Sequence, residues 1–250
     1  MKKIILTALG ALAVSGAIGS ALAADLPPRP YVAPIMPPVL YNWTGPYIGV
    51  HVGWGSADKD WTQTSPAAFA TNTASFTADG VIGGGQIGYN WQTGNFVFGV
   101  EVDVSGSDMN GSAAQTLTPS WRSNTDINWL GTATGRFGYA WDRVLVYAKG
   151  GFAWADEDHF QHFTPAATGV ATEVSRINNT HTGWVVGGGV EVALWENWTG
   201  KVEYNFIDLG RENFTFLNVA PAPGARATDF WNIEQQIHLV KFGANYRFRW

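Results

Sequence analysis

Three features of the sequence predict an all-β fold: an eight-stranded antiparallel up-and-down transmembrane β-barrel, preceded by a cleaved signal peptide and a Pro-rich tether. First, the last fifteen residues, 236–250, place apolar or aromatic side chains at every second position, which is typical of a strand whose two faces meet different surroundings. Second, seven earlier segments alternate in the same way, and the connections between segments are short and long in turn. Third, the tryptophans fall near the ends of the segments, as expected for amphipathic rings at the headgroup levels of a bilayer.

The composition argues against an ordinary soluble enzyme. Charged residues make up 14% of the chain, aromatic residues also 14%, and there are 30 glycines, whereas about a quarter of the residues in a typical domain are charged. No run of 18 apolar residues follows residue 23, which excludes helical membrane spans. The absence of cysteine excludes disulfides and thiolate metal sites. The net charge of −5 argues against nucleic acid as a partner.

The first 23 residues are predicted to be a signal peptide. Lys2 and Lys3 form a basic start, an apolar stretch runs from Ile4 to Ile18, and Ala21-Leu22-Ala23 is a small-x-small cleavage site. An uncleaved membrane anchor is the alternative interpretation. Residues 24–43 are rich in proline and predict a periplasmic tether, so the barrel domain is expected over residues 44–250.

The eight alternating segments predict the strands in order. The short connections, such as Asp142-Arg143, lie on one side, and long connections of roughly fifteen to twenty-five residues lie on the other, as in barrels with short periplasmic turns. The predicted strands are 45–56, 78–91, 95–109, 124–141, 144–156, 180–195, 198–213 and 238–250.

The inward face of these strands carries charged residues that are predicted to meet in the lumen. A carboxylate in a narrow lumen is costly unless it is paired, and the interior of an eight-stranded barrel is only wide enough for side chains. We therefore expect a salt-bridge and hydrogen-bond network that plugs the barrel; an ion pathway is the alternative. The expected members are Glu101, Asp103, Arg136, Lys149, Glu191, Lys201, Glu203, Lys241 and Arg247, with Arg249 beyond them.

The tryptophans predict two aromatic girdles. One is expected at the periplasmic ends of the strands and comprises Trp91, Trp141, Trp195, Trp198 and Trp250. The other is expected at the opposite ends and comprises Trp54, Trp61, Trp121, Trp129, Trp154, Trp184 and Trp231.

Two motifs could carry chemistry. Gly83, Gly85 and Gly88 spell G-x-G-x-x-G, but the motif lies within a predicted strand and not at a strand-to-helix turn, so no dinucleotide site is predicted. His159 and His162 follow an acidic run in a predicted long loop and could bind a haem iron or a metal. The other three histidines are single and lack the partners of a catalytic triad. No catalytic residue and no dedicated metal site are predicted, so the protein is not expected to be an enzyme.

Four stretches resemble the small outer-membrane β-barrel proteins of alphaproteobacteria, which are OmpA/OmpX-like eight-stranded barrels. They are the start ending in A-L-A-A-D-L-P, W-T-G-P-Y-I-G at 43–49, N-F-I-D-L-G at 205–210 and F-G-A-N-Y-R-F at 242–248. The group includes major surface antigens and haem-binding relatives. The resemblance implies an outer-membrane location and an assembly machinery that reads the terminal strand through Tyr246, Phe248 and Trp250. The family usually ends in Phe, whereas this chain ends in Trp250.

Together these features predict a non-catalytic outer-membrane protein with an envelope-structural and surface role. A small porin that passes ions or small solutes is one alternative, and loop-mediated binding of haem or a host surface is another. The expected partners are outer-membrane lipid and the barrel-assembly machinery, with peptidoglycan or a host surface as further candidates. Apart from the haem alternative, no cofactor is expected.

Overall fold

The computed structural model describes residues 41–65, 72–164, 169–216 and 229–248. The predicted signal peptide and most of the predicted tether therefore fall outside the described residues. The described part of the chain contains no helix that is long and apolar enough to span a membrane.

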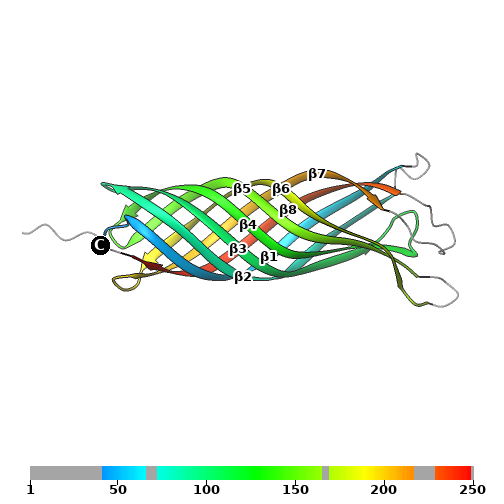
Figure 1. Ribbon diagram of the computed structural model, residues 1–250, viewed down its shortest axis with the longest axis horizontal. Helices are drawn as coiled ribbons and strands as arrows, with labels where there is room; N and C mark the ends of the chain where they lie inside the picture. Colours follow the sequence, from blue (N-terminus) through cyan, green and yellow to red (C-terminus); the bar gives the residue numbers. More distant parts are fainter. Residues whose placement is uncertain (1–40, 66–71, 165–168, 217–228, 249–250) are drawn as a thin grey trace, which may run out of the picture. The chain divides into compact units, whose positions relative to one another are not determined.

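Eight antiparallel strands close into a barrel, in which each strand pairs with its neighbours in the sequence and β1 pairs with β8 (Figure 1). The predicted fold class is confirmed. The closing ladder matches Ile48 with Tyr246 and Trp54 with Val240, so no strand edge is left open to lipid. The strands are β1 (Gly45–Ser65), β2 (Thr73–Thr93), β3 (Phe96–Ala114), β4 (Trp121–Trp141), β5 (Val144–Phe163), β6 (Thr172–Ala193), β7 (Trp198–Phe216) and β8 (Asp229–Arg247).

The two ends of the barrel differ, and we call them the turn end and the loop end. The turn end, on the left in Figure 1, carries the connections 94–95, 142–143 and 194–197. Gly94 and Asp142 have φ angles of 60° and 51° there, the left-handed conformation that tight turns require. β1 begins and β8 ends at this end.

The strands extend further toward the loop end than predicted. The long connections shrink to 66–72, 115–120, 164–171 and 217–228. The prediction was wrong here because it followed the alternation of apolar side chains, whereas the backbone ladder continues after that alternation stops. Polar stretches such as 105–114 of β3 still pair with β4, since backbone groups bond regardless of the side chains they carry.

The outer face of the barrel is apolar over a band next to the turn end and becomes acidic beyond it. On β3 the exposed side chains run from Phe96 to Val104 and are followed by Asp108. The same change from apolar to acidic occurs on five other strands. This band is therefore the part of the barrel suited to lipid. We call the aspartates that mark the limit of this band toward the loop end the acidic ring: Asp58, Asp79, Asp108, Asp126, Asp156 and Asp208.

Tryptophans lie at both limits of the apolar band. Trp91, Trp141, Trp195 and Trp198 are exposed near the turn end, whereas Trp250 is outside the described residues. At the other limit Trp54, Trp129 and Trp184 are exposed and Trp154 is half-buried. The prediction that Trp61, Trp121 and Trp231 belong to this second girdle was wrong, because all three are buried, at 0%, 9% and 1% exposure.

Apolar and polar layers alternate along the lumen. Near the turn end lies the turn-end cluster, formed by Tyr41, Trp43, Val97, Ala140, Leu145, Tyr147 and Ala193. The central cluster is formed by Ala57, Ala78, Ile82, Met109, Ile127, Leu130, Ala153, Ala155, Val185, Ile207, Leu209, Ile237 and Leu239. The loop-end cluster is formed by Trp61, Ala74, Phe214, Phe216, Trp231 and Ile233.

Polar layers lie between these clusters, as the inward residues of β8 show. Lys241 lies on the turn-end side of the central cluster, and Gln235 lies between the central cluster and the loop-end cluster. Two polar layers of the described lumen therefore lie between apolar ones. Both are candidate sites.

Candidate functional site

The polar layer nearer the turn end contains eight charged side chains, which we call the inner network. Its members are contributed by β3 to β8, and none is more than 4% exposed. Four are acids and four are bases, so the formal charges cancel, which favours the burial of all eight. They are Glu101, Asp103, Glu191, Glu203, Arg136, Lys149, Lys201 and Lys241.

Two lysines bridge two glutamates at the centre of the inner network. Lys149 Nζ lies 2.9 Å from Glu101 Oε1 and 3.0 Å from Glu203 Oε1. Lys201 Nζ lies 3.0 Å from Glu101 Oε2 and 3.4 Å from Glu203 Oε2. Each carboxylate therefore receives both ammonium groups, so that no single pair can separate without loosening the other contacts.

Two tyrosines donate further hydrogen bonds to these two carboxylates. The hydroxyl of Tyr47 donates to Glu101 Oε2 at 2.9 Å, and that of Tyr147 donates to Glu203 Oε2 at 2.7 Å. The Arg136 guanidinium lies 4.7 Å and 5.1 Å from the centres of their two rings. Neither tyrosine stands out in the sequence as a network member, although both occupy inward positions of their strands.

The remaining two carboxylates are held at the edges of the inner network. Asp103 accepts from Lys241 at 2.9 Å and from the Thr132 hydroxyl at 2.5 Å. Glu191 accepts from Arg136 at 3.3 Å and from the Asn245 amide at 2.9 Å. All four carboxylates of the inner network thus have charged and neutral donors, which offset the cost of desolvating them.

The structure does not bring Arg247 into the network. No carboxylate of the described residues lies within 4.0 Å of it, and its Nη2 donates to the backbone oxygen of Trp43. The guanidinium lies over the rings of Trp43 and Tyr47, at 5.1 Å and 5.8 Å. Its place on β8 puts it at the level of the turn-end cluster, past the last inward carboxylate. Arg249 is outside the described residues.

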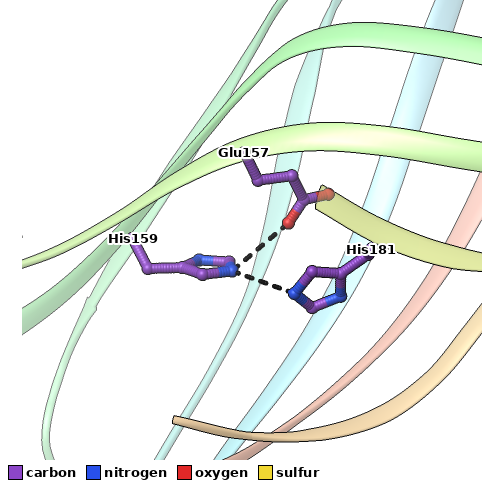
Figure 2. A group of neighbouring side chains, drawn as sticks. All are labelled: Glu157, His159 and His181. Carbon is purple, nitrogen blue, oxygen red and sulfur yellow. Dashed lines mark hydrogen bonds and ion pairs between the residues drawn. The ribbon is translucent and has the colours of Figure 1, made fainter. Parts of the chain in front are cut away.

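The second polar layer contains a group of three residues, which we call the outer cluster: Glu157 and His159 on β5, and His181 on β6 (Figure 2). His159 Nε2 lies 3.4 Å from Glu157 Oε2 and 3.5 Å from His181 Nε2. All three side chains are fully buried. The outward neighbours of Glu157 are Asp156 and Asp158, so the outer cluster lies beyond the apolar band and outside the lipid-spanning part of the barrel.

Residues from four other strands surround the outer cluster. Lys59 Nζ lies 2.5 Å from Glu157 Oε2, and Gln235 bonds both of these side chains. The Thr125 hydroxyl lies 2.9 Å from His159 Nδ1. Phe214 packs on both imidazoles, with ring centres 5.0 Å and 5.3 Å apart.

Burial controls the protonation of His159. It lowers the pKa of His159 well below its usual value, and the nearby positive charge of Lys59 lowers it further. The imidazole is therefore neutral at physiological pH and carries a lone pair on one ring nitrogen. Burial also lowers the pKa of Lys59, an effect that Glu157 opposes.

The predicted pairing of His159 with His162 does not occur. Both residues lie on β5 and not in a loop. His159 points into the lumen, whereas His162 is half-buried on the outer face, with its Nδ1 3.1 Å from the Asn124 amide nitrogen. Two residues that are three positions apart on a strand point to opposite faces, because successive side chains alternate. The structure instead brings His159 to His181, an inward residue of the neighbouring strand.

One further set of histidine contacts resembles a catalytic triad. His51 Nε2 lies 2.7 Å from the Ser105 hydroxyl, and its Nδ1 lies 2.6 Å from Gln86 Oε1. The third member is an amide, which cannot stabilise an imidazolium as a carboxylate does. All three side chains are also buried among the lumen layers.

The aromatic residues at the turn end of the terminal strand, Tyr246 and Phe248, face outward. Tyr246 packs against Trp198 and Phe248, with ring centres 5.3 Å and 5.1 Å apart. Its hydroxyl accepts from the Asn197 amide at 3.1 Å. Trp250, the third residue of the predicted assembly signal, lies outside the described residues.

Residues 9–248 match the family described as outer membrane protein beta-barrel domain. The chain belongs to this family. Family membership agrees with the closed eight-stranded barrel, and it places the protein in the bacterial outer membrane. Barrels of this kind have their short turns in the periplasm, so the loop end is the outer end.

Curated relatives carry names that agree with this placement. The chain is 31% identical over 260 residues to the 31 kDa outer-membrane immunogenic protein of Brucella melitensis, covering 99% of this chain and 100% of that one. It is 26% identical over 201 residues to the 25 kDa outer-membrane immunogenic protein of Brucella abortus, covering 78% and 80%.

Solved structures share the fold at low sequence identity. The outer membrane protein OprG from Pseudomonas aeruginosa superposes with a TM-score of 0.51 at 10% identity, covering 83% of this chain and 98% of that one. The outer membrane protease OmpT from Escherichia coli also gives 0.51, at 8% identity, covering 82% and 97%. At such identities the likeness concerns the fold alone.

Proposed function

We propose that the protein is a non-catalytic barrel with an envelope-structural and surface role, and that the inner network closes its lumen. The observation that carries the proposal is the pairing of eight buried charges across the barrel interior, with no net formal charge. Such a layer ties strands β3 to β8 together from within.

The layers on either side of the network support a closed lumen. On β5, Lys149 has Leu145 and Tyr147 on its turn-end side and Ala153 and Ala155 on its loop-end side. An ion crossing the barrel would have to pass both apolar layers and displace paired charges in a medium of low dielectric constant. Side chains alone can fill an eight-stranded barrel.

A non-catalytic role is supported by the surroundings of the titratable groups. The inner network consists of mutually paired charges, and His51 lies with Ser105 and Gln86 inside the barrel. A general base must reach a bound substrate, and these groups face other side chains of the lumen.

Conductance in planar lipid bilayers tests the closed lumen. The folded wild-type protein is expected to produce no stable channels. The double variant Glu101→Ala/Arg136→Ala removes two large side chains from the network, and channel events in this variant but not in the wild type would support closure of the lumen by the network. The control Arg211→Ala/Glu234→Ala removes an ion pair whose side chains are 67% and 36% exposed, and it is expected to remain silent. Stable wild-type channels whose ion selectivity reverses in Glu203→Lys would contradict the proposal and identify a small porin.

Epitope insertion tests the surface role. An epitope placed between β5 and β6, at 164–171, is expected to be labelled by antibody on intact cells. The same epitope at the turn 194–197 is expected to be labelled only after the outer membrane is permeabilised. Equal labelling of both insertions on intact cells would contradict the assigned orientation.

A further inference from the structure

We propose that the outer cluster is a binding site for a divalent first-row transition-metal ion, with Glu157, His159 and His181 as its ligands. This inference concerns the second polar layer and does not depend on whether the inner network closes the lumen.

The spacing of the three groups fits a metal centre. Ligand atoms at about 2.0–2.2 Å from a tetrahedral ion lie roughly 3.3–3.6 Å from one another. The observed separations from His159 Nε2 are 3.4 Å to Glu157 Oε2 and 3.5 Å to His181 Nε2. The three ligand atoms all lie within 4.8 Å of one another, so small side-chain rotations complete the geometry (Figure 2).

The donor set selects the class of ion. Two imidazoles and one carboxylate are ligands that zinc and neighbouring transition metals prefer, whereas magnesium and calcium prefer oxygen alone. Three protein ligands leave one position for water or a further group. Glu212 Oε2, 3.7 Å from His181 Nε2, brings a second carboxylate to the same place.

His159 has the kind of outer partner that metal-binding histidines have, whereas His181 Nδ1 is buried without a hydrogen-bond partner. The Thr125 hydroxyl can accept a hydrogen bond from the Nδ1–H of His159, and in this tautomer the Nε2 lone pair is directed at the cluster. Two imidazole Nε2 atoms face each other in a buried layer, where a cation between them would satisfy both lone pairs. Phe214 lies nearly parallel to the His181 ring, at 11°, and holds its orientation.

Glu212 also provides an approach to the site. Its side chain is 39% exposed, whereas His181 beside it is buried. A hydrated cation would meet this exposed carboxylate before it meets the buried ligands. The aspartates of the acidic ring on the outer face of the strands make the surroundings negative and attract cations over longer range.

Lys59 is the built-in competitor for the site. Its ammonium lies 2.5 Å from Glu157 Oε2, the carboxylate oxygen that faces His159. A metal must share or displace this contact, so the lysine weakens metal binding by charge repulsion. Replacing Lys59 is therefore expected to tighten binding.

Calorimetric titration of the folded, chelator-treated barrel with Zn²⁺ tests the proposal. One ion per chain is expected to bind the wild-type protein. His181→Ala and Glu157→Gln are each expected to weaken binding by at least about tenfold. The matched control His162→Ala removes a histidine from the outer face of the same strand and is expected to change the affinity by less than about twofold. Lys59→Met is expected to bind Zn²⁺ several-fold more tightly. Faster migration of unboiled than of boiled samples on a denaturing gel establishes that each variant is folded.

Titration of the wild-type protein with Co²⁺ gives a readout that needs no variant. Ligation by two imidazoles and a carboxylate is expected to produce visible absorption bands that added Zn²⁺ abolishes. The proposal is overturned if the wild-type protein binds no Zn²⁺, if Co²⁺ remains in its aqueous spectrum, or if His162→Ala weakens binding as much as His181→Ala. Unchanged or weaker binding by Lys59→Met would overturn the assignment of Glu157 Oε2 as a ligand.

Discussion

Lys149 illustrates how much one side chain of the inner network is expected to contribute to the stability of the barrel. It contacts Glu101, Glu203 and Asp103 at 2.9, 3.0 and 3.6 Å and is 3% exposed. Removing it leaves carboxylates buried with fewer donors, and unpaired buried charges are costly. Lys149→Met is expected to lower the free energy of unfolding by about 3–5 kcal/mol, measured by urea titration in lipid vesicles.

The control for this prediction is the exposed pair between Arg211 and Glu234. Its N–O distance is 2.6 Å, but its side chains are 67% and 36% exposed. Solvent screens such a pair, so Arg211→Ala is expected to cost less than about 1 kcal/mol. Equal losses in Lys149→Met and Arg211→Ala would show that the inner network does not stabilise the barrel.

Gly88 tests the close packing around the tyrosines. A Cβ added there would lie 2.2 Å from the Tyr47 hydroxyl, so the ring would have to leave Glu101. Gly88→Ala is expected to cost about 1–3 kcal/mol. Gly85→Ala is the control on the same strand, because a Cβ there would lie 3.4 Å from its nearest neighbour; a change of less than about 0.5 kcal/mol is expected.

The direction of single side chains was predictable only while the alternation was unbroken. Lys149, Glu101 and Lys241 are buried at positions that the alternation assigns to the lumen, because no bulge separates them from the apolar outward residues of their strands. Trp61 is seven residues from the outward-facing Trp54, so strict alternation along the strand also assigns its side chain to the lumen. Trp121 could not be placed by counting, because a register shift between Ile127 and Trp129 reverses the faces of β4.

At the level of strands, β7 shows why such shifts matter. The ladder with β8 shifts between Asp208 and Gly210, where Gly210 has a φ of 71° and its amide donates to the Asp208 carboxylate. The extra residue turns Phe214 into the lumen, where it packs on His159 and His181. The outer cluster was therefore not predictable from spacing alone, since its surroundings depend on a bulge.

The two halves of the barrel repeat one arrangement. Tyr47 lies opposite Gly88 and bonds Glu101, and Tyr147 lies opposite Gly189 and bonds Glu203. Two segments of the sequence are similar, V-I-G-G-G at 81–85 and V-V-G-G-G at 185–189, and aligning them matches Gly85 with Gly189. In the structure, however, Gly88 is the equivalent of Gly189, so the structural repeat is offset by three residues from the sequence similarity.

The terminal strand offers a prediction about assembly. Tyr246 and Phe248 face outward at the turn end. The family resemblance implies that an assembly machinery recognises the strand there. A polar extension after Trp250 is expected to reduce the amount of folded protein in the outer membrane, measured by heat-modifiable gel migration. The same peptide inserted between β7 and β8, at 217–228, is the control. Normal levels of the extended protein would contradict an assembly role for this end.

At the scale of the whole molecule, the apolar band and the acidic ring define the depth of the barrel in a bilayer. Val100 lies on the outer face in the middle of the band and is 51% exposed, whereas Asp108 lies beyond it on the same strand. Val100→Arg is expected to cost about 2–4 kcal/mol and Asp108→Arg about 0–1 kcal/mol, measured by unfolding in vesicles. Similar costs at both positions would contradict this placement.

The fold as a whole was more predictable than its sites. Strand number, order and lipid-facing side follow from a period of two that recurs eight times, with residues such as Phe98, Val100 and Val102 repeating the signal. The outer cluster depends on one contact between β5 and β6, which brings together His159 and His181. Nothing in the spacing of two histidines 22 positions apart marks them as neighbours.

The pairing of β1 with β8 also imposes an order in time. Hairpins such as β2–β3 join residues close in the chain, but the seam joins Tyr47 to Arg247, and closing a loop of that length costs roughly 5 kcal/mol of chain entropy. Contacts that are distant in sequence form slowly, because chain entropy is lost before the contacts are made. We therefore expect the seam to be the final ladder to form, with one edge of the strand that opens the barrel domain unpaired until the last strand has arrived.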